Sequence, residues 1–261
     1  MPVYHTAAGT VEMLEWGEGP ELFVLLHAAA AGPHSLSVLA GLLVRQGRRV
    51  IAPALHRYGA TVMHEATDRV RANLGVLRAC LDIHAAEPRV VFGHSMGGLV
   101  GLLGALDGLP LDALALYEPI VTACLGDYEA ALRDWDRAIV ADVERSIATG
   151  DPEAGIAAFI TAWNETPWGA LPSTARARLV ASARELAVDM HAVSYCTVQL
   201  DRLAQLQMPV LLLQGALSPT ITHAMSARLS ALLPRARKIT IEGCGHMGPV
   251  QAPEAIAAAI T

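Results

Sequence analysis

The chain has 261 residues, and 53% of them are apolar, which is enough for one large hydrophobic core. Its formal net charge is −6 and Lys238 is its only lysine, so we expect no nucleic-acid partner. No uninterrupted apolar run could span a bilayer and no signal peptide is expected at residues 1–5, so we expect no membrane partner. The four cysteines lack metal-ligand spacing, which is typical of reduced thiols in a cytoplasmic protein without a metal site.

In the first half of the chain, strand-type segments alternate with amphipathic helices. Several strands are continuous apolar runs, as expected where both faces of a parallel sheet are covered. This alternation predicts a parallel sheet connected by right-handed crossovers. The predicted strands are Val11–Trp16, Leu22–Leu26, Arg49–Leu55, the run that begins at Arg89, and Asp112–Tyr117. The predicted helices are Ser35–Gln46, Thr67–Ala85 and Met96–Ala105.

The pattern changes between Ile120 and Gln207, where no convincing strand is found. We interpret residues 120–207 as a helical cap over the site, inserted between core segments 1–119 and 208–261; the alternative is an additional structural layer of helices. Aromatic residues in this segment suggest an apolar pocket, although they could equally pack the helices together: Tyr128, Trp135, Trp163, Trp168 and Tyr195. The predicted helices are Asp127–Ala148, Pro152–Trp163, Thr174–Leu186 and Met190–Leu206.

The sheet pattern resumes after the helical segment and continues to the end of the chain. Residues 243–249 form a glycine-rich loop between the last predicted strand and the closing helix. The predicted elements are the strand Pro209–Gly215, the helix Ile221–Leu233, the strand Arg237–Glu242 and the helix Pro253–Ile260.

The most informative motif is Gly-x-Ser-x-Gly around Ser95, placed between a predicted strand and a predicted helix. A nucleophile on such a sharp turn sits in strained backbone, and small residues two positions before and after it, here Gly93 and Gly97, let neighbouring backbone approach. The following helix points free N–H groups at the site from its first turn. We therefore predict that Ser95 is a nucleophile.

A serine hydroxyl needs a base within hydrogen-bond reach and an acid that orients the base. His246 is the candidate base, because it lies in the glycine-rich loop after the last strand. His27 and His94 are placed to support loops rather than to reach the serine.

These segments resemble the α/β-hydrolase superfamily over essentially the whole chain. The matching pieces are Leu25-Leu26-His27, Gly93-His94-Ser95-Met96-Gly97-Gly98, Pro209-Val210-Leu211-Leu212-Leu213-Gln214-Gly215 and Gly245-His246-Met247. The resemblance implies an α/β fold with a mostly parallel eight-stranded sheet flanked by helices, a helical cap after the sixth strand, and no cofactor. The chain looks closest to small bacterial capped esterases and lactonases of that superfamily.

The chain departs from the family pattern at two places. The family usually has His-Gly after the early strand, whereas this chain has His27-Ala28. The resemblance implies an oxyanion hole built from the backbone N–H groups of Ala29 and Met96. Alanine keeps the N–H group, but a residue with a Cβ at position 28 does not readily adopt positive φ, so the loop is expected to be reshaped.

The second departure concerns the acid. The family's usual acid position after the Pro209–Gly215 strand holds Ser218, which cannot carry the required charge. Glu118 is the best replacement, because it ends the strand Asp112–Tyr117 at the carboxyl edge of the sheet, where ligands bind in open α/β sheets. The alternative is that Glu118 is a solvated loop residue or pairs with an arginine of the cap.

The sequence thus predicts a serine hydrolase that cleaves a small neutral carboxylic ester through an acyl-enzyme on Ser95. A lactonase, a thioesterase, a C–C bond hydrolase or a perhydrolase could use the same triad. A non-catalytic binding protein with this fold is the alternative outside enzymes, suggested by the changed acid and the His27-Ala28 loop. The expected partner is a small-molecule ester, and the sequence does not indicate an oligomeric state.

Overall fold

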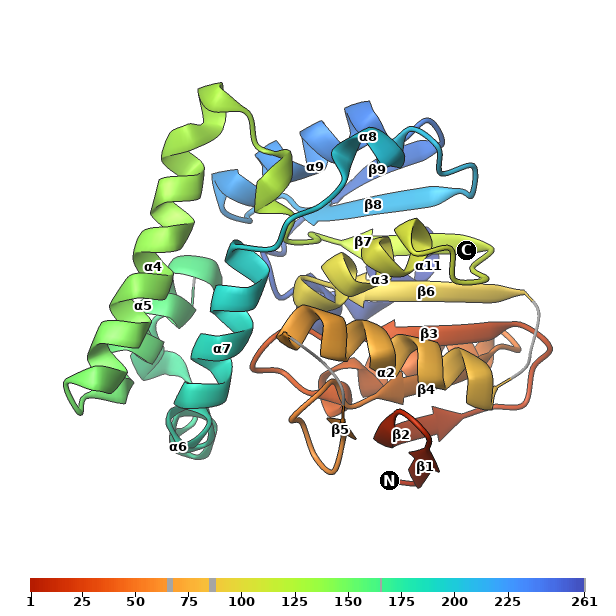
Figure 1. Cartoon of the computed structure of the whole chain (residues 1–261), viewed down its shortest axis with the longest axis horizontal. Coiled ribbons are helices and arrows are strands. Elements are labelled where there is room, and N and C mark those ends of the chain that lie inside the picture. Colours follow the sequence, from red (N-terminus) through yellow and green to blue (C-terminus); the bar gives the residue numbers. More distant parts are fainter. Residues whose placement is uncertain (65–67, 85–87, 165, 261) are drawn as a thin grey trace.

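The computed structural model describes residues 1–64, 68–84, 88–164 and 166–260, which form a nine-stranded sheet (Figure 1). The strand order is β1-β2-β4-β3-β6-β7-β8-β9, and the short β5 pairs with β2. Strands β4, β3, β6, β7, β8 and β9 run parallel, whereas β1, β2 and β5 pair antiparallel. The strands are Val3–Thr6 (β1), Gly9–Trp16 (β2), Leu22–Leu26 (β3), Arg49–Pro53 (β4), Val62–Met63 (β5), Arg89–His94 (β6), Ala113–Tyr117 (β7), Val210–Gly215 (β8) and Ala236–Ile241 (β9).

The mostly parallel α/β sheet expected from the sequence is confirmed, but the expected number of eight strands is wrong. The additional strand is β5, in which Val62 and Met63 pair with Thr10 and Gly9. A strand of two residues is too short to show hydrophobic alternation, so the sequence does not predict it.

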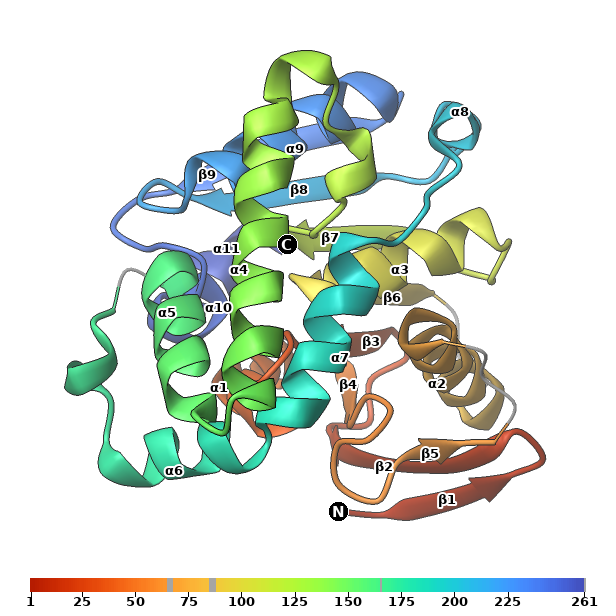
Figure 2. The same cartoon turned by 60° about the vertical axis from the view of Figure 1, so that its left-hand side comes forward.

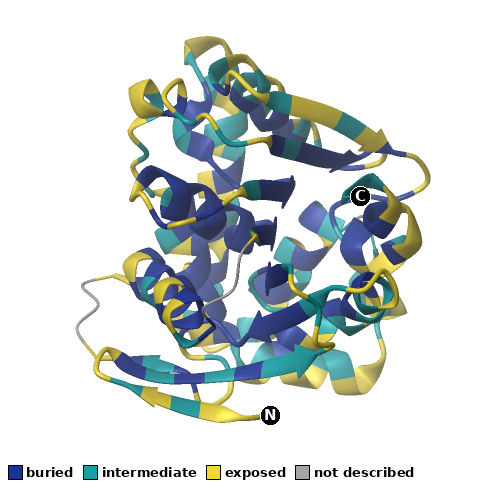
Figure 3. Ribbon diagram, turned by 90° about the vertical axis from the view of Figure 1, so that its right-hand side faces the viewer, coloured by how far each residue is buried: buried dark blue, intermediate teal, exposed yellow. Residues whose placement is uncertain are grey.

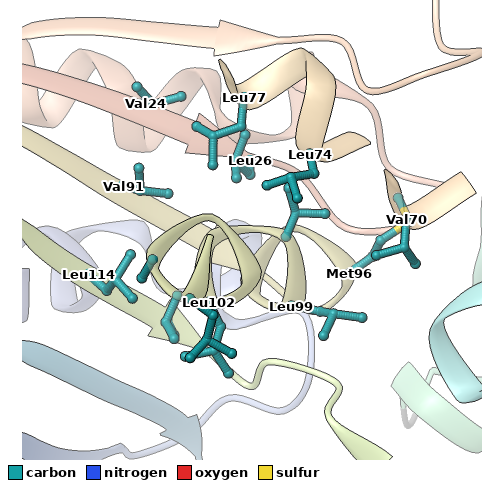
Figure 4. Close-up of a cluster of buried hydrophobic side chains, with 14 of the residues drawn as sticks. Val24, Leu26, Val70, Leu74, Leu77, Val91, Met96, Leu99, Leu102 and Leu114 are labelled. Carbon is teal, nitrogen blue, oxygen red and sulfur yellow. The ribbon is translucent and has the colours of Figure 1, made fainter. Parts of the chain in front are cut away.

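Helices cover both faces of the sheet, which is why its central strands are apolar throughout. Val24 and Leu26 of β3 belong to one hydrophobic cluster with residues of α2 and α3 (Figure 4). Residues of α9 belong to the same cluster. Phe23 and Leu25 point the other way and pack with α1 and α11. Alternate side chains of one strand thus enter two separate cores. These helices are Ser37–Arg45 (α1), Arg69–Ile83 (α2), Met96–Leu106 (α3), Thr220–Leu232 (α9) and Pro253–Ile260 (α11).

At their ends, two helices of the core differ from the predicted ranges. The predicted helix 35–46 begins with a 3₁₀ turn, Pro33–Leu36, before α1. The helix predicted for 67–85 corresponds to α2, and residues 67 and 85 lie outside the described residues. Asp68 caps α2, because its side chain accepts a hydrogen bond from the Arg71 N–H at 2.8 Å.

Between β7 and β8, the described residues form helices and no strand. Figures 1 and 2 show α4 to α7 beyond the arrowhead ends of the parallel strands. These helices have an apolar core of their own, which includes Val140, Ile156 and Leu186. None of the helices in the described residues has both the length and the apolar character needed to cross a membrane. The helices of this segment are Ala130–Ala148 (α4), Pro152–Asn164 (α5), Ser173–Ala181 (α6), Ala183–Ser194 (α7) and Leu200–Leu203 (α8).

The predicted break between helices at residues 187–189 is wrong. The chain instead breaks at Ser182, whose hydroxyl donates to the carbonyl oxygens of Arg178 and Leu179, both at 3.1 Å, and ends α6. Helix α7 then continues through Asp189, which is fully buried. Asp189, which falls within the predicted break, therefore lies inside a helix and faces inward.

The chain buries most of its sulfur as well as its aliphatic side chains. Cys80, Cys124 and Cys244 are buried free thiols, and Cys196 is partly exposed just after α7. Burial raises the pKa of the Cys124 thiol to about 12. Figure 3 shows the general pattern, with buried residues along the sheet and exposed residues on the outer helix faces.

Candidate active site

Ser95 stands on a strained turn between β6 and α3, with φ 56° and ψ −114°. A Cβ on Gly93 would lie 2.5 Å from the Gly97 carbonyl oxygen, and a Cβ on Gly97 would overlap the Leu26 carbonyl. Only glycine fits at these two positions. Conformations of this kind are costly and persist where the surrounding structure enforces them. The elbow geometry that the sequence motif predicts is therefore present in the structure.

The structure brings Glu118 and His246 together. The Glu118 Oε2 atom lies 2.7 Å from His246 Nδ1, and its Oε1 atom accepts a hydrogen bond from the Gly215 N–H at 2.7 Å. The Glu118 side chain is fully buried, and its backbone has φ 45°. The carboxylate thus spans from the end of β7 to the end of β8, where the Gly215 N–H stabilises it.

Ser218, at the family's usual acid position, takes no part in this contact. Its hydroxyl oxygen is buried and has no hydrogen-bond partner among the described residues. The alternatives for Glu118, a solvated loop residue or an ion-pair partner of an arginine, do not agree with its complete burial or with its contacts to the Gly215 N–H and His246 Nδ1.

His94, which the sequence places in a loop-supporting role, and Tyr117, which the sequence does not single out, hold the His246 loop. The Tyr117 hydroxyl donates to the Gly245 carbonyl at 2.6 Å, and His94 Nε2 donates to the His246 carbonyl at 2.8 Å. Burial lowers the pKa of His94 well below its ordinary value, so its ring is neutral. His94 and Tyr117 are register partners in β6 and β7, and each directly precedes a site residue. One rung of the sheet therefore positions the serine, the carboxylate and the histidine loop.

His27 supports the loop after β3. Its Nε2 atom accepts a hydrogen bond from the Leu55 N–H at 3.1 Å, so Nδ1 carries the proton and donates to the Ala28 carbonyl at 2.7 Å. Burial lowers the pKa of His27 to about 4. The left-handed residue of this loop is Ala30, with φ 64°, and the Tyr58 hydroxyl accepts its N–H at 2.8 Å. The loop thus turns two residues later than the position where the family has glycine.

Two cavities meet at the serine. The smaller one holds about 40 Å³ and is lined by Ser95, Met96, Ala29, His246 and residues of α4, α5 and α7. The larger one holds about 370 Å³ and extends from Ser95 and His246 toward α5, α6 and residues 247–251. Of the five residues selected from the sequence, four line the small cavity, and Glu118 contacts the His246 ring.

Of the five aromatic residues noted in the helical segment, Trp163 lines the small cavity. Its ring centroid lies 5.0 Å from that of His246, and Trp135 packs against it at 5.5 Å. Tyr128 is 99% exposed, and the Trp168 indole N–H donates to Glu153 at 3.0 Å. Phe159, which the sequence analysis did not single out, lines both cavities.

Two buried carboxylates also line the small cavity, Asp136 on α4 and Asp189 on α7. Asp189 accepts a hydrogen bond from the Tyr58 hydroxyl at 2.7 Å and pairs with Arg69 at 3.0 Å. Burial raises the pKa of Asp189 to about 6, although the Arg69 charge and the Tyr58 hydrogen bond act in the opposite direction. The sequence carried a signal for both: each aspartate lies on the buried stripe of its helix.

Within the described ranges, no group of three His, Cys, Asp or Glu side chains is arranged to hold a metal ion. Ser95 and His246 line the same two cavities, and Glu118 contacts His246, so this arrangement can support proton transfer between the serine and the histidine, with backbone N–H groups near the serine.

A family model described as "Alpha/beta hydrolase family" matches residues 23–259. Among solved structures, the chain is similar to an alpha/beta hydrolase from Sphaerobacter thermophilus DSM 20745, at 24% identity and TM-score 0.71, covering 99% of this chain and 98% of that chain. It is similar to an esterase from Exiguobacterium antarcticum, at 14% identity and TM-score 0.77, covering 99% of this chain and 97% of that chain. It is also similar to Est816, an N-acyl homoserine lactone degrading enzyme, at 17% identity and TM-score 0.71, covering 99% of this chain and 98% of that chain. Curated protein sequences gave no significant match.

The mostly parallel sheet presents Ser95 on a strand-to-helix turn, beside the buried His246–Glu118 pair. These features define a class of α/β proteins whose site lies at the carboxyl ends of the strands. The chain belongs to the alpha/beta hydrolase family.

Proposed function

We propose that this chain is a serine hydrolase of small neutral carboxylic esters, with Ser95, His246 and Glu118 as its catalytic triad. The observation that carries the proposal is the 2.7 Å contact between Glu118 Oε2 and His246 Nδ1, which is buried beside the serine of the elbow. A carboxylate on Nδ1 leaves Nε2 free to accept a proton and stabilises the imidazolium that forms.

The reaction starts when His246 takes the proton of the Ser95 hydroxyl and the serine oxygen attacks the ester carbonyl. The N–H groups of Met96 and Ala29 hold the oxyanion, and His246 then protonates the departing alcohol. Water hydrolyses the acyl-enzyme by the same sequence of proton transfers. This chain's own residues supply each proton acceptor and donor of the cycle.

Backbone strain favours catalysis over a binding protein that merely keeps the fold. Ser95 and Glu118 are both non-glycine residues with positive φ, and strain of this kind gathers where function requires it. A receptor site has no need to hold a serine and a glutamate in such conformations. The lactone-degrading enzyme among the similar structures supports a cyclic ester as a second substrate type, since a lactone is attacked at the same carbonyl.

The test is hydrolysis of p-nitrophenyl butyrate by wild type, Ser95→Ala and Glu118→Gln, with exposed Glu254→Gln as the matched control. Ser95→Ala is expected to lower kcat by at least about 10⁴-fold and Glu118→Gln by about 10²- to 10⁴-fold, because each removes one member of a unit that acts together. Glu254→Gln should behave as wild type.

Two results would contradict the proposal in different ways. If wild type neither hydrolyses esters nor reacts with a fluorophosphonate at Ser95, the chain is not a serine hydrolase. If Glu118→Gln folds and keeps nearly full activity, Glu118 does not orient His246, and the triad assignment is wrong.

A further inference from the structure

The helices over the site contain a carboxylate that the proposed chemistry does not use. Asp136 is 4% exposed and lines the small cavity beside Ser95. Its Oδ2 atom is buried and has no hydrogen-bond partner among the described residues. A buried polar atom without a partner costs free energy, so its retention in a cavity points to a group that arrives with the substrate.

Asp189 provides an internal comparison. It lines the same cavity from α7, yet its charge is paired: Oδ2 accepts a hydrogen bond from the Tyr58 hydroxyl at 2.7 Å, and Oδ1, which accepts no hydrogen bond among the described residues, forms an ion pair with Arg69 at 3.0 Å. Its role in joining elements is therefore already fulfilled by the protein. Asp136 forms no ion pair among the described residues, and burial raises its pKa although a hydrogen bond with Ser194 and the Arg137 charge lower it. Of the two carboxylates, Asp136 is the one that remains available to a ligand.

The size and lining of the cavity limit what can enter. About 40 Å³ is roughly a quarter of the 150 Å³ that admits a benzene ring, so an aromatic group does not fit, whereas a hydroxyl or ammonium group does. The remaining walls include Ile120, Phe159 and Trp163, which cannot accept a hydrogen bond. A carboxylate substituent is excluded, because it would face Asp136 with like charge.

We propose that Asp136 is a specificity-determining residue that binds a hydrogen-bond donor on the short acyl group of the substrate, so that the preferred substrates are hydroxy- or amino-substituted short-chain esters. This inference rests on the proposed function, since Ser95 must attack the carbonyl next to that acyl group. The bulkier alcohol portion of the ester then occupies the 370 Å³ cavity on the other side of the serine.

The experiment compares kcat/KM for p-nitrophenyl esters of butyrate, 2-hydroxybutyrate, 3-hydroxybutyrate and 3-aminobutyrate. We expect wild type to prefer at least one substituted ester over butyrate by about 10-fold or more. Asp136→Leu removes the acceptor, so that preference should be lost, a fall of about 10-fold or more, which one hydrogen bond to a charged group supplies. Asp136→Asn keeps a neutral acceptor oxygen, so it should lose more of the preference for the amino ester than for the hydroxy esters. The hydroxy and amino arms distinguish a neutral from a cationic donor. Asp134→Asn, at an exposed position of the same helix, is the matched control and should keep the wild-type preference.

Thermal unfolding separates binding from a structural role. Because the buried Asp136 Oδ2 atom has no hydrogen-bond partner among the described residues, Asp136→Leu should unfold at the same temperature as wild type or higher. A lower Tm together with an equal loss of activity on every ester would show that the carboxylate is structural and would overturn the inference. Hydrolysis of all esters without preference, still abolished by Ser95→Ala, would overturn the inference and leave the proposed function intact. No turnover of any ester would overturn both.

Discussion

His27 lies buried beneath the site, with both of its ring nitrogens in hydrogen bonds. Its pKa is lowered to about 4 by burial, while the unfolded chain titrates near the ordinary value of 6.5. Between pH 4 and pH 6.5, His27 is protonated in the unfolded chain and neutral in the folded chain. The contribution of His27 to the unfolding free energy is therefore fully present above pH 6.5 and is lost as the pH falls from 6.5 toward 4.

We expect His27→Gln to flatten this loss, because glutamine can accept the Leu55 N–H without titrating. The two pKa values correspond to on the order of 3 kcal/mol between pH 7.5 and pH 4. Urea unfolding of wild type and His27→Gln across this range measures the difference. His64→Gln, at an exposed position, should follow the wild-type curve. Parallel curves for wild type and His27→Gln would show that another group causes the acid sensitivity.

Single residues of the site differed in how far the sequence revealed them. Ser95 and His246 could be found because glycines next to them mark a turn and a loop, and Glu118 because it ends a buried strand. The conformation of Glu118 could not be predicted: nothing in the sequence indicates that this residue has φ 45° or that its second oxygen binds the Gly215 N–H. Such contacts join residues about 100 positions apart, and only the folded sheet brings them together.

At the scale of elements, the turn from β6 to α3 depends on a close approach between backbones. We expect Gly97→Ala to destabilise the fold by several kcal/mol and to abolish activity, because the added methyl group would overlap the Leu26 carbonyl. Gly41→Ala in α1 is the matched control. A Cβ there meets no atom within 4 Å, so alanine should stabilise the helix by about 0.5–1 kcal/mol.

Chemical denaturation of the two glycine variants measures both effects in one experiment. If Gly97→Ala were as stable and active as wild type, the turn would not require the close approach seen in the structure. A destabilised Gly41→Ala would mean that α1 does not tolerate a side chain at this position.

Elements were predictable where one physical signal dominated. The strands β3 and β7 are apolar throughout, and β8 is apolar up to Gln214, because helices cover both faces of the sheet; their bounds agree closely with the predictions. The boundary between α6 and α7 was not predictable, since it depends on the Ser182 hydroxyl bonding back to its own helix. The burial of Asp189 within α7 depends on its contacts with Tyr58 and Arg69, which lie far from it in the sequence.

At the scale of the whole molecule, Arg69 of α2 connects the sheet domain to the helices above it. Its guanidinium pairs with Asp189 of α7 at 3.0 Å and donates to the His56 carbonyl at 3.0 Å. Asp189 in turn binds Tyr58, which holds the N–H of Ala30 in the loop next to the serine. Buried charges therefore tie three segments of the chain together close to the site.

We expect Arg69→Met to cost about 3–5 kcal/mol, because it leaves Asp189 buried without its cation. The double variant Arg69→Met/Asp189→Leu should lose less than the sum of the two single variants, since neither partner is then left unpaired. Arg71→Met, whose pair with Asp107 is solvent-exposed, is the control and should cost at most about 1 kcal/mol. Urea unfolding of wild type and the variants gives the coupling free energy between Arg69 and Asp189. If the two single variants lost stability additively, the two residues would not be coupled.

The distribution of thiols has a practical consequence for spectroscopy. Three of the four cysteines are buried, and Cys196 is partly exposed where the chain leaves α7 on its way to β8. Burial also raises the pKa of the Cys196 thiol, so a maleimide dye should couple faster at mildly alkaline pH than at neutral pH. A dye at this position would sit at the junction between the helices and the sheet. Without any cysteine replacement, the chain thus offers a natural attachment point for a fluorophore that reports relative movement of its two parts during turnover.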